Sequence, residues 1–406
     1  MSTRSEAVGA SRARSGRVSE ASKAATHARL DTMLVIATLS LLTLGLVMIL
    51  SASSVSSFAT YGSSFLFFKK QVLWAAIGIV AFFAFARLDY RRLKGFGYLA
   101  VVAVVLLLVA VAIPGVGMVV GGSARWLGAG PLSFQPSEFA KLAVILFAAD
   151  VLSRKPEKTL RVFSHTLLPV IPVLAVIALL VILQPDLGTT LLIGTIGIGV
   201  LFVAGAPLRH LVPIAAAGGG IATLAAIIEP YRRARILSFI DPWADPLNTG
   251  YQAIQSLIAL GSGGFFGVGL GASRQKWLYV PNAHTDFIYA ILGEEMGLFG
   301  TLVVLGLFAF IAYIGIRIAK NAPDRFGMLI AAGVTIWMAT QALINMGAVT
   351  AALPITGVPL PLVSFGGSSL VVSLIAMGIL TNIATQATDG RPRRIGRRSR
   401  RSRTAS

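Results

Sequence analysis

The sequence predicts an all-α polytopic membrane protein with about ten transmembrane helices and a large extracytoplasmic loop between spans seven and eight. Only 13% of its 406 residues are charged, whereas a soluble domain carries about 25%. Hydrophobic residues make up 55% of the chain, and the mean hydropathy is +0.80. Many apolar runs approach the roughly 20 residues that cross the hydrocarbon core. The lack of cysteine excludes disulfides, thiolate metal sites and cysteine nucleophiles.

Three regions differ in composition. Residues 1–30 are rich in Ser, Ala and Arg without hydrophobic periodicity, which predicts a disordered basic cytoplasmic tail. Residues 31–386 form the expected transmembrane domain, and residues 387–406 form a second disordered, Arg-rich cytoplasmic tail. The first apolar run is long enough to span a bilayer and further runs follow it, so we interpret it as an uncleaved anchor.

Ten apolar runs are the candidate spans. They cover residues 32–51, 71–86, 97–114, 136–152, 166–183, 187–205, 208–228, 287–318, 325–348 and 370–384. The eighth run is long enough to tilt or to extend past the lipid.

The distribution of basic residues predicts the orientation. An even number of spans places both tails on one side, and 26 of the 35 Lys and Arg residues lie in the tails and in the loops on that side. Because basic residues concentrate in cytoplasmic loops, both termini are expected in the cytoplasm of a bacterial plasma membrane. The Arg-rich C-terminus is interpreted as a topology and anionic-lipid determinant. No aromatic residues interleave with it, so nucleic-acid binding is not expected.

The longest outer loop covers residues 229–286. Apolar residues recur at helical spacing within it, as in Ile254, Leu257 and Ile258, which suits a short helix lying at the membrane interface. A loop of this length without a core of its own is usually functional.

Several ionisable residues lie in or beside spans, where their cost makes them functional candidates. Glu138 and Lys141 are three residues apart and share a helix face. They form either a structural ion pair that locks the bundle or a pair that lines a polar cavity and contacts substrate. Asp186 suits a helix cap. Glu294 and Glu295 point about 100° apart, so one of them is expected to be buried and paired.

Outer arginines form a second group of candidates. Arg232, Arg233 and Arg235 follow span seven closely. Clustered guanidinium groups suit a diphosphate, which they bind through bidentate hydrogen bonds, or lipid headgroups. Arg125, beside Trp126 in an outer loop, has the same two interpretations.

Asp286 is the sharpest candidate for chemistry. It ends the long loop near aromatic residues such as Trp277 and Tyr279, so its carboxylate is either a partly desolvated general base or the N-cap of the following helix. His284 is expected to be a hydrogen-bonding partner. A protein-built zinc site is not expected, because no second His lies nearby and the chain has no Cys.

A Pro- and Gly-rich segment, residues 354–369, interrupts the apolar pattern near membrane depth. Irregular backbone at that depth must be buried in protein or line a polar cavity. Its Gly-Gly-Ser-Ser run is able to present N–H groups to an anion, but it is not a Walker motif, and no nucleotide is expected as a cofactor.

Several motifs occur in a diagnostic order. They are Gly-Ser-Ala-Arg-Trp at 122–126, Phe-Gln-Pro-Ser-Glu at 134–138 with Lys141, Gln-Pro-Asp-Leu-Gly at 184–188, Asp-Pro-Trp at 241–243, Gly-Tyr-Gln at 250–252, His-Thr-Asp-Phe-Ile at 284–288 with Gly-Glu-Glu at 293–295, and Ser-Phe-Gly-Gly-Ser-Ser at 364–369. On these residues the chain resembles the SEDS family (shape, elongation, division and sporulation) over about 32–384. The division-type branch of the family is favoured by three of its motifs: Asp-Pro-Trp at 241–243, Gln-Lys-Trp at 275–277 and Pro-Asn-Ala-His at 281–284. Phe365 replaces the Tyr common in the family.

The resemblance implies a glycosyltransferase that polymerises lipid II into peptidoglycan strands at the division septum. The implied partners are lipid II and the growing glycan strand, a class B penicillin-binding protein, other divisome membrane proteins and the lipid bilayer. The family's essential loop carboxylate corresponds to Asp286. The substrate-binding candidates that we name are Arg125, Glu138, Lys141, Arg232, Arg233 and His284.

The resemblance also implies a mechanism. Asp286 would accept the proton of the acceptor's 4-hydroxyl, whose oxygen attacks C1 of the donor sugar with inversion. Undecaprenyl pyrophosphate would leave, its charge stabilised by arginines or by a divalent cation, Mg²⁺ or Mn²⁺. The alternatives are a lipid II flippase, the elongation-type member of the family, and a division scaffold without activity. The sequence has no obvious internal repeat and its candidate groups cluster at the outer side, which favours surface chemistry over transport.

Overall fold

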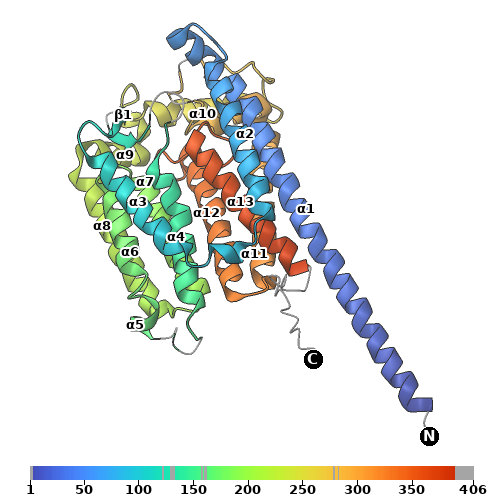
Figure 1. The fold of residues 1–406 in the computed structure, drawn as a ribbon. Coiled ribbons are helices and arrows are strands. Elements are labelled where there is room, and N and C mark those ends of the chain that lie inside the picture. Colours follow the sequence, from blue (N-terminus) through green and yellow to red (C-terminus); the bar gives the residue numbers. More distant parts are fainter. Residues whose placement is uncertain are drawn as a thin grey trace, which may run out of the picture.

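A helix occupies each of the ten predicted spans in the computed structural model (Figure 1). The structure describes residues 3–120, 123–128, 133–156, 159, 162–277, 279–281 and 283–388. The helices are α1 (Thr3–Tyr61), α2 (Leu66–Arg87), α3 (Phe96–Ala112), α4 (Pro136–Ser153), α5 (Phe163–Thr166), α6 (Ile171–Ile182), α7 (Leu187–Val203), α8 (Leu208–Ile228), α9 (Pro230–Ile240), α10 (Tyr251–Gly263), α11 (Ile288–Asn321), α12 (Arg325–Val349) and α13 (Gly367–Thr388), with the 3₁₀ turns η1 (Tyr90–Leu93) and η4 (Pro242–Ala244).

The predicted all-α polytopic membrane fold is confirmed. Within the described residues, six helices are long and apolar enough to cross a membrane: α1 from Leu30, α2, α8, α11, α12 and α13. The shorter α3, α6 and α7 are also apolar. The remaining helix among the ten spans is α4. It carries three ionisable residues, Glu138, Lys141 and Asp150, which are all buried against its neighbours.

Three local features differ from the predictions. The fifth span is broken into α5 and α6, because Pro169 and Pro172 cannot donate backbone hydrogen bonds within a continuous helix. α11 is kinked at Gly297, whose φ is 66°. The outer loop before α4 contains an unpredicted antiparallel hairpin of β1 (Met118–Val120) and β2 (Ser123–Trp126).

The N-terminal tail is also corrected. The structure continues α1 as a helix back to Thr3, where the sequence analysis predicts disorder over residues 1–30. The tail is rich in alanine and contains no proline, so no residue interrupts the helix that the first span begins. The second predicted tail lies outside the described residues from position 389 onward.

The long loop folds over one end of the bundle. Figure 1 shows α9 and α10, which both belong to this loop, at the same end of the helices as β1. α8 lies at the edge of the bundle and is the least buried of the six long apolar helices, whereas α12 and α13 are the most buried. The loop therefore spreads across the outer ends of helices that differ greatly in exposure.

The segment between α12 and α13, residues 350–366, is irregular and enters the protein interior. Its apolar residues Val358, Leu360, Leu362 and Val363 are buried, which agrees with the requirement that such backbone be enclosed by protein. Gly45 of α1 permits this approach, because a Cβ at that position would lie 2.7 Å from the Leu362 carbonyl oxygen. The first residues of this 350–366 segment reach the site described next.

Candidate functional site

A cavity of about 810 Å³ lies among α7, α8, α9 and residues 354–357. Its lining residues are Ser123, Arg125, Pro185, Leu187, Gly188, Leu191, Gly219, Ala222, Thr223, Ala226, Glu229, Arg232, Arg235, Ile236, Asp286, Pro354, Ile355, Thr356 and Gly357. The apolar residues come mainly from α7 and α8, and the charged residues come from the outer segments. The cavity thus joins an apolar wall to a charged rim.

Asp286 contributes its side chain to this cavity. The N-cap of α11 is Phe287, and no side chain makes a capping hydrogen bond there, so the helix-cap interpretation of Asp286 is wrong. A Cβ placed on Gly357 would lie 3.5 Å from Asp286 Oδ2 and 3.8 Å from Arg235 Nη1. The carboxylate and this guanidinium therefore approach the same point of the cavity wall.

The surroundings of Asp286 favour its protonated form. Burial raises the pKa of this carboxyl to about 6, and the nearby Asp186 acts in the same direction. Arg235 and Arg125 oppose the rise, since a cation stabilises the carboxylate. A pKa near 6 leaves the group ionised at neutral pH and still basic enough to accept a proton, which is what a general base needs.

Arg125 and Arg232 are held by backbone carbonyl groups on the cavity wall. Arg125 donates to the Gln184 oxygen at 2.8 Å and to the Pro185 oxygen at 2.6 Å, which ties β2 to the turn before α7. Arg232 donates to the Ile182 oxygen at 3.1 Å and to the Ala225 oxygen at 3.2 Å. A guanidinium has five N–H donors, so these two side chains are fixed in place and still able to bind an anion.

The structure places Arg235, and not the predicted Arg233, in the lining of the cavity. Arg233 is exposed and is not among the lining residues, whereas Arg232, Arg235 and Ile236 all line the cavity. Adjacent residues on α9 point about 100° apart, so Arg233 faces away when its neighbour faces in. The helical spacing of Arg232 and Arg235 is the sequence signal that identifies this pair. Arg235 also donates to the Ile355 oxygen at 3.3 Å.

The Glu138–Lys141 pair is not among the residues that line this cavity, and its contact with substrate stays a prediction. Lys141 Nζ lies 2.8 Å from Glu138 Oε2 and 3.0 Å from Gln341 Oε1, and it sits 4.8 Å from the centre of the Trp337 ring. Both charged side chains are almost completely buried. The structural interpretation of the pair is favoured, because it joins α4 to α12 inside the bundle.

His284 also lies outside the lining of this cavity, and its predicted contact with substrate stays a prediction. Its ring stacks on Phe67 at 4.6 Å and meets Phe365 edge-on at 5.6 Å. Burial lowers the pKa of His284 to about 4, so the ring is neutral at physiological pH. Its carbonyl accepts a hydrogen bond from the Phe365 amide at 2.9 Å, and His284 therefore anchors the chain two residues before Asp286.

Asp186 is the N-cap of α7, which confirms the predicted capping role. Its Oδ1 accepts from the Thr189 amide at 3.0 Å at the start of α7, and its Oδ2 accepts from Gln135 Nε2 at 3.1 Å. This capped carboxylate is the neighbour that disfavours ionisation of Asp286.

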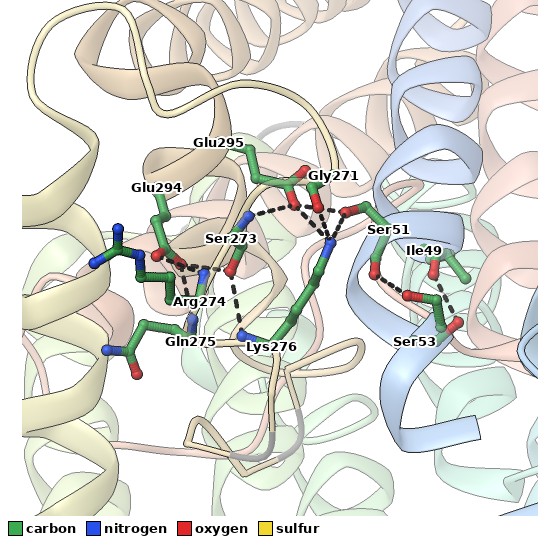
Figure 2. Close-up of polar contacts among 11 residues, drawn as sticks. Ile49, Ser51, Ser53, Gly271, Ser273, Arg274, Gln275, Lys276, Glu294 and Glu295 are labelled. Carbon is green, nitrogen blue, oxygen red and sulfur yellow. Dashed lines mark hydrogen bonds and ion pairs between the residues drawn. The ribbon is translucent and has the colours of Figure 1, made fainter. Parts of the chain in front are cut away.

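Glu294 and Glu295 are both buried, whereas the sequence predicted burial for only one (Figure 2). Glu295 accepts from Ser51 Oγ of α1 at 2.5 Å and lies 3.5 Å from Lys276 Nζ. Glu294 accepts from Ser273 Oγ at 2.5 Å. Both carboxylates bind the loop that leads to Asp286 and fasten it to α11, and Glu295 also joins it to α1.

A metal ion has few protein ligands here. In the described part of the chain no three His, Asp or Glu side chains gather closely enough to hold one. The cavity itself contains the carboxylates of Asp286 and Glu229 beside three arginines. These two carboxylates do not make a complete metal site. The positive charge in the cavity comes from the three guanidinium groups.

Known proteins are similar to this chain in sequence and in fold. The family model described as "Cell cycle protein" (FtsW, RodA and SpoVE) matches residues 32–389. "Stage V sporulation protein E" of Bacillus subtilis (strain 168) is 47% identical over 356 residues, which cover 87% of this chain and 96% of that protein. "Probable peptidoglycan glycosyltransferase FtsW" of Geobacter metallireducens is 39% identical over 358 residues, which cover 88% and 95%.

Solved structures agree with these relatives. A chain described under "Structural coordination of polymerization and crosslinking by a peptidoglycan synthase complex" superposes with a TM-score of 0.71 at 31% identity, covering 87% of this chain and 97% of that chain. The crystal structure of the rod shape determining protein RodA of Thermus thermophilus gives a TM-score of 0.64 at 28% identity, covering 86% and 95%. The chain belongs to the SEDS family of FtsW, RodA and SpoVE proteins.

Proposed function

We propose that this protein is a peptidoglycan glycosyltransferase that polymerises lipid II, with Asp286 as the general base. The observation that carries the proposal is the position of Asp286: its carboxylate lines a cavity of about 810 Å³ together with Arg125, Arg232 and Arg235. A base beside a cluster of guanidinium groups suits an attack that expels a diphosphate. The relatives called probable peptidoglycan glycosyltransferases support this reaction class.

The proposed reaction moves one proton and exchanges one glycosidic bond. Asp286 accepts the proton of the acceptor sugar's 4-hydroxyl while that oxygen forms a bond to C1 of the donor sugar. The bond between C1 and the diphosphate oxygen breaks, with inversion at C1, and undecaprenyl pyrophosphate leaves. The guanidinium groups at the rim stabilise the negative charge that develops on the leaving group.

The size and the composition of the cavity agree with an amphiphilic donor. Ligand sites typically occupy about 300–1,000 Å³, so the volume suits a headgroup that carries sugars and phosphates. Leu191 and Ala222 line its apolar part, whereas Arg125 and Arg232 line its rim. The donor's lipid would lie against α7 and α8, and its diphosphate would lie at the arginines.

The proposed partner is a class B penicillin-binding protein that crosslinks the new strands. Support comes from the 31% identical chain described as part of a peptidoglycan synthase complex that coordinates polymerization and crosslinking. The proposed location is the bacterial plasma membrane, at the division septum. The relatives called FtsW support a role in division, whereas the 47% identical relative is a sporulation protein. Depletion in the source cell distinguishes the two roles, since loss of a division enzyme gives filaments and loss of a sporulation enzyme gives defective spores.

The decisive experiment uses the purified full-length protein with its candidate penicillin-binding partner and labelled lipid II. Glycan chains are resolved by gel electrophoresis with and without Mg²⁺. Asp286→Asn keeps the size of the side chain and removes the base, so it is expected to lower the rate about 10²–10⁴-fold. Asp241→Asn is the matched control, because Asp241 lies exposed in the same loop and caps η4, a role that Asn also fills.

Polymerisation by Asp286→Asn at the wild-type rate would contradict the proposal. In that case the same protein, reconstituted in vesicles, is assayed for movement of lipid II across the bilayer. Transport that survives in Asp286→Asn would favour the flippase alternative.

A further inference from the structure

One buried amide joins Asp286 to the 350–366 segment. Asn345 of α12 donates from Nδ2 to the Asp286 carbonyl oxygen at 2.8 Å and to the Val358 carbonyl oxygen at 2.9 Å. The Asn345 side chain is only 1% exposed. The two carbonyls come from segments on opposite sides of α12 in the sequence, and a single NH₂ group holds them together.

From this contact we propose that Asn345 is a positioning residue, which sets the place of the Asp286 carboxylate in the cavity by tying the Asp286 backbone to Val358. The proposal rests on the proposed function of Asp286 as the base. It adds a residue that lies outside the cavity lining and acts only through the backbone of its neighbour.

The chemistry of the contact favours an amide at this position. Two carbonyl oxygens need two donors, and the NH₂ of Asn supplies both from one atom. Asn345 Oδ1 is buried and makes no hydrogen bond within the described residues. A buried acceptor that is left unpaired lowers stability, so Asn345 occupies this position at some expense to stability. A requirement for its two donors accounts for that expense.

A second amide on the same face of α12 strengthens the argument. Gln341 lies one turn before Asn345 and donates from Nε2 to the Pro359 oxygen at 2.8 Å. Its Oε1 accepts from Lys141 Nζ at 3.0 Å and from Trp337 Nε1 at 2.6 Å. The 350–366 segment is therefore held at two successive residues by α12, and only the Asn345 contact extends to Asp286.

The rest of the loop has an independent attachment. Glu294 and Glu295 bind its earlier part, around Ser273 and Lys276, as Figure 2 shows. Those contacts lie ten or more residues before Asp286 in the chain. A second contact ties the end of the loop to the 350–366 segment, since the His284 carbonyl accepts from the Phe365 amide at 2.9 Å. Without Asn345 both of these attachments would remain, but the Asp286 carbonyl would lose its tie to Val358.

The effect on pH dependence follows from the groups around the carboxylate. The charged groups that act on Asp286 or share its cavity are Arg125 of β2, Asp186 before α7, Glu229 before α9, and Arg232 and Arg235 of α9. Displacement toward solvent reduces the burial that disfavours the ionised form of Asp286. The acidic limb of the rate profile, below which the base is protonated, should then move to lower pH.

The test compares Asn345→Leu, Asn345→Gln and Asn382→Leu in the full-length protein with its partner and lipid II. Leu keeps the branched shape of residue 345, in a larger volume, and removes both donors, whereas Gln keeps the donors on a side chain one methylene longer. Asn382 is the matched control, since it is a buried asparagine of α13 that also joins two segments: it donates to the Ala86 oxygen at 2.8 Å and accepts from the Tyr90 amide at 3.1 Å. The measurements are kcat, KM, the pH profile and Tm, with Asp286→Asn in parallel.

We expect Asn345→Leu to lower kcat about 10- to 100-fold with KM within about twofold, because a misplacement near 1 Å has that cost. Its acidic limb should move to lower pH, Asn345→Gln should lie between Leu and wild type, and Asn382→Leu should change Tm without moving the limb. An unchanged limb and kcat in Asn345→Leu, or an equal change in Asn382→Leu, would overturn the inference. If Asn345→Leu does not fold, Asn345→Ser, whose short hydroxyl cannot reach both carbonyls, is measured against the same expectations. Activity in Asp286→Asn would instead overturn the proposed function.

Discussion

Replacement of Arg235 by glutamine tests the electrostatics of the site most directly. Asp286 Oδ2 and Arg235 Nη1 lie within 3.5 Å and 3.8 Å of the same point, so they are at most about 7.3 Å apart. At an effective dielectric constant of about 20, unit charges at that distance attract by about 2.3 kcal/mol. Since about 1.36 kcal/mol corresponds to one pH unit, the loss of the cation should raise the acidic limb of kcat/KM by about 1 to 2 pH units.

The sign of this shift follows from the role of the base. Arg235 stabilises the ionised form of Asp286 and so holds its pKa down against the effect of burial. Without Arg235 the carboxylate takes up its proton at higher pH, and the unprotonated base is lost earlier as the pH falls. The position of the limb separates this effect from weaker binding of the diphosphate, which lowers the rate at every pH.

The assay measures initial rates of lipid II polymerisation from about pH 5 to pH 9, a range that brackets a base with a pKa near 6. Arg233→Gln is the matched control, because it removes the same charge from the same helix at an exposed position outside the cavity. The reasoning is refuted if Arg235→Gln leaves the limb at its wild-type position, or if Arg233→Gln moves it equally.

Three further predictions follow from the same contacts. Because burial raises the pKa of Asp286 to about 6, its ionised form opposes folding above that pH; Asp286→Asn should stabilise the protein by about 1–3 kcal/mol at pH 7.5 and by nothing at pH 3.5, measured as Tm in detergent. Lys141→Met leaves the Glu138 charge buried without its partner and should destabilise the protein by about 3–5 kcal/mol. The double variant with Glu138→Gln should recover much of the Tm. A stable double variant without polymerase activity would contradict a purely structural role for the pair. Gly357→Ala adds a Cβ at a φ of 74°, which side chains rarely adopt, and should destabilise the protein by about 1–3 kcal/mol, measured as Tm; an unchanged Tm would contradict the left-handed backbone that we describe.

The local chemistry of the helices was largely predictable. Apolar runs of spanning length gave the ten helical segments, and the capping role of Asp186 followed from its residue type at the start of a helix. The motifs predicted the family. The Pro- and Gly-rich composition of residues 354–369 predicted irregular backbone there. The kink at Gly297 was less predictable, because it depends on the close approach of the Phe265 and Gly267 backbone.

The site required more than local pattern. Arg233 and Arg235 have the same side chain two positions apart, and only the rotation of α9 against the cavity decides which one enters it. Glu138 and Lys141 were correctly expected to pair, but the pairing distance does not tell whether the pair meets a substrate or α12. Asn345 and Gln341 gave no signal, since a single amide within an apolar helix has many possible partners.

The sequence by itself determined that the protein is a helical membrane protein, that Asp286 ends a long outer loop, and that the chain resembles a family of cell-wall enzymes. These conclusions rest on composition and on the order of residues, which act along the chain. Tertiary structure decided that Asp286 lines a cavity and does not cap α11, and that Arg125, Arg232 and Arg235 accompany it. Arg125 lies 161 positions from Asp286 in the chain, and Arg232 and Arg235 lie more than 50 positions from it. The geometry of these contacts is set by helix packing and by the burial of charge.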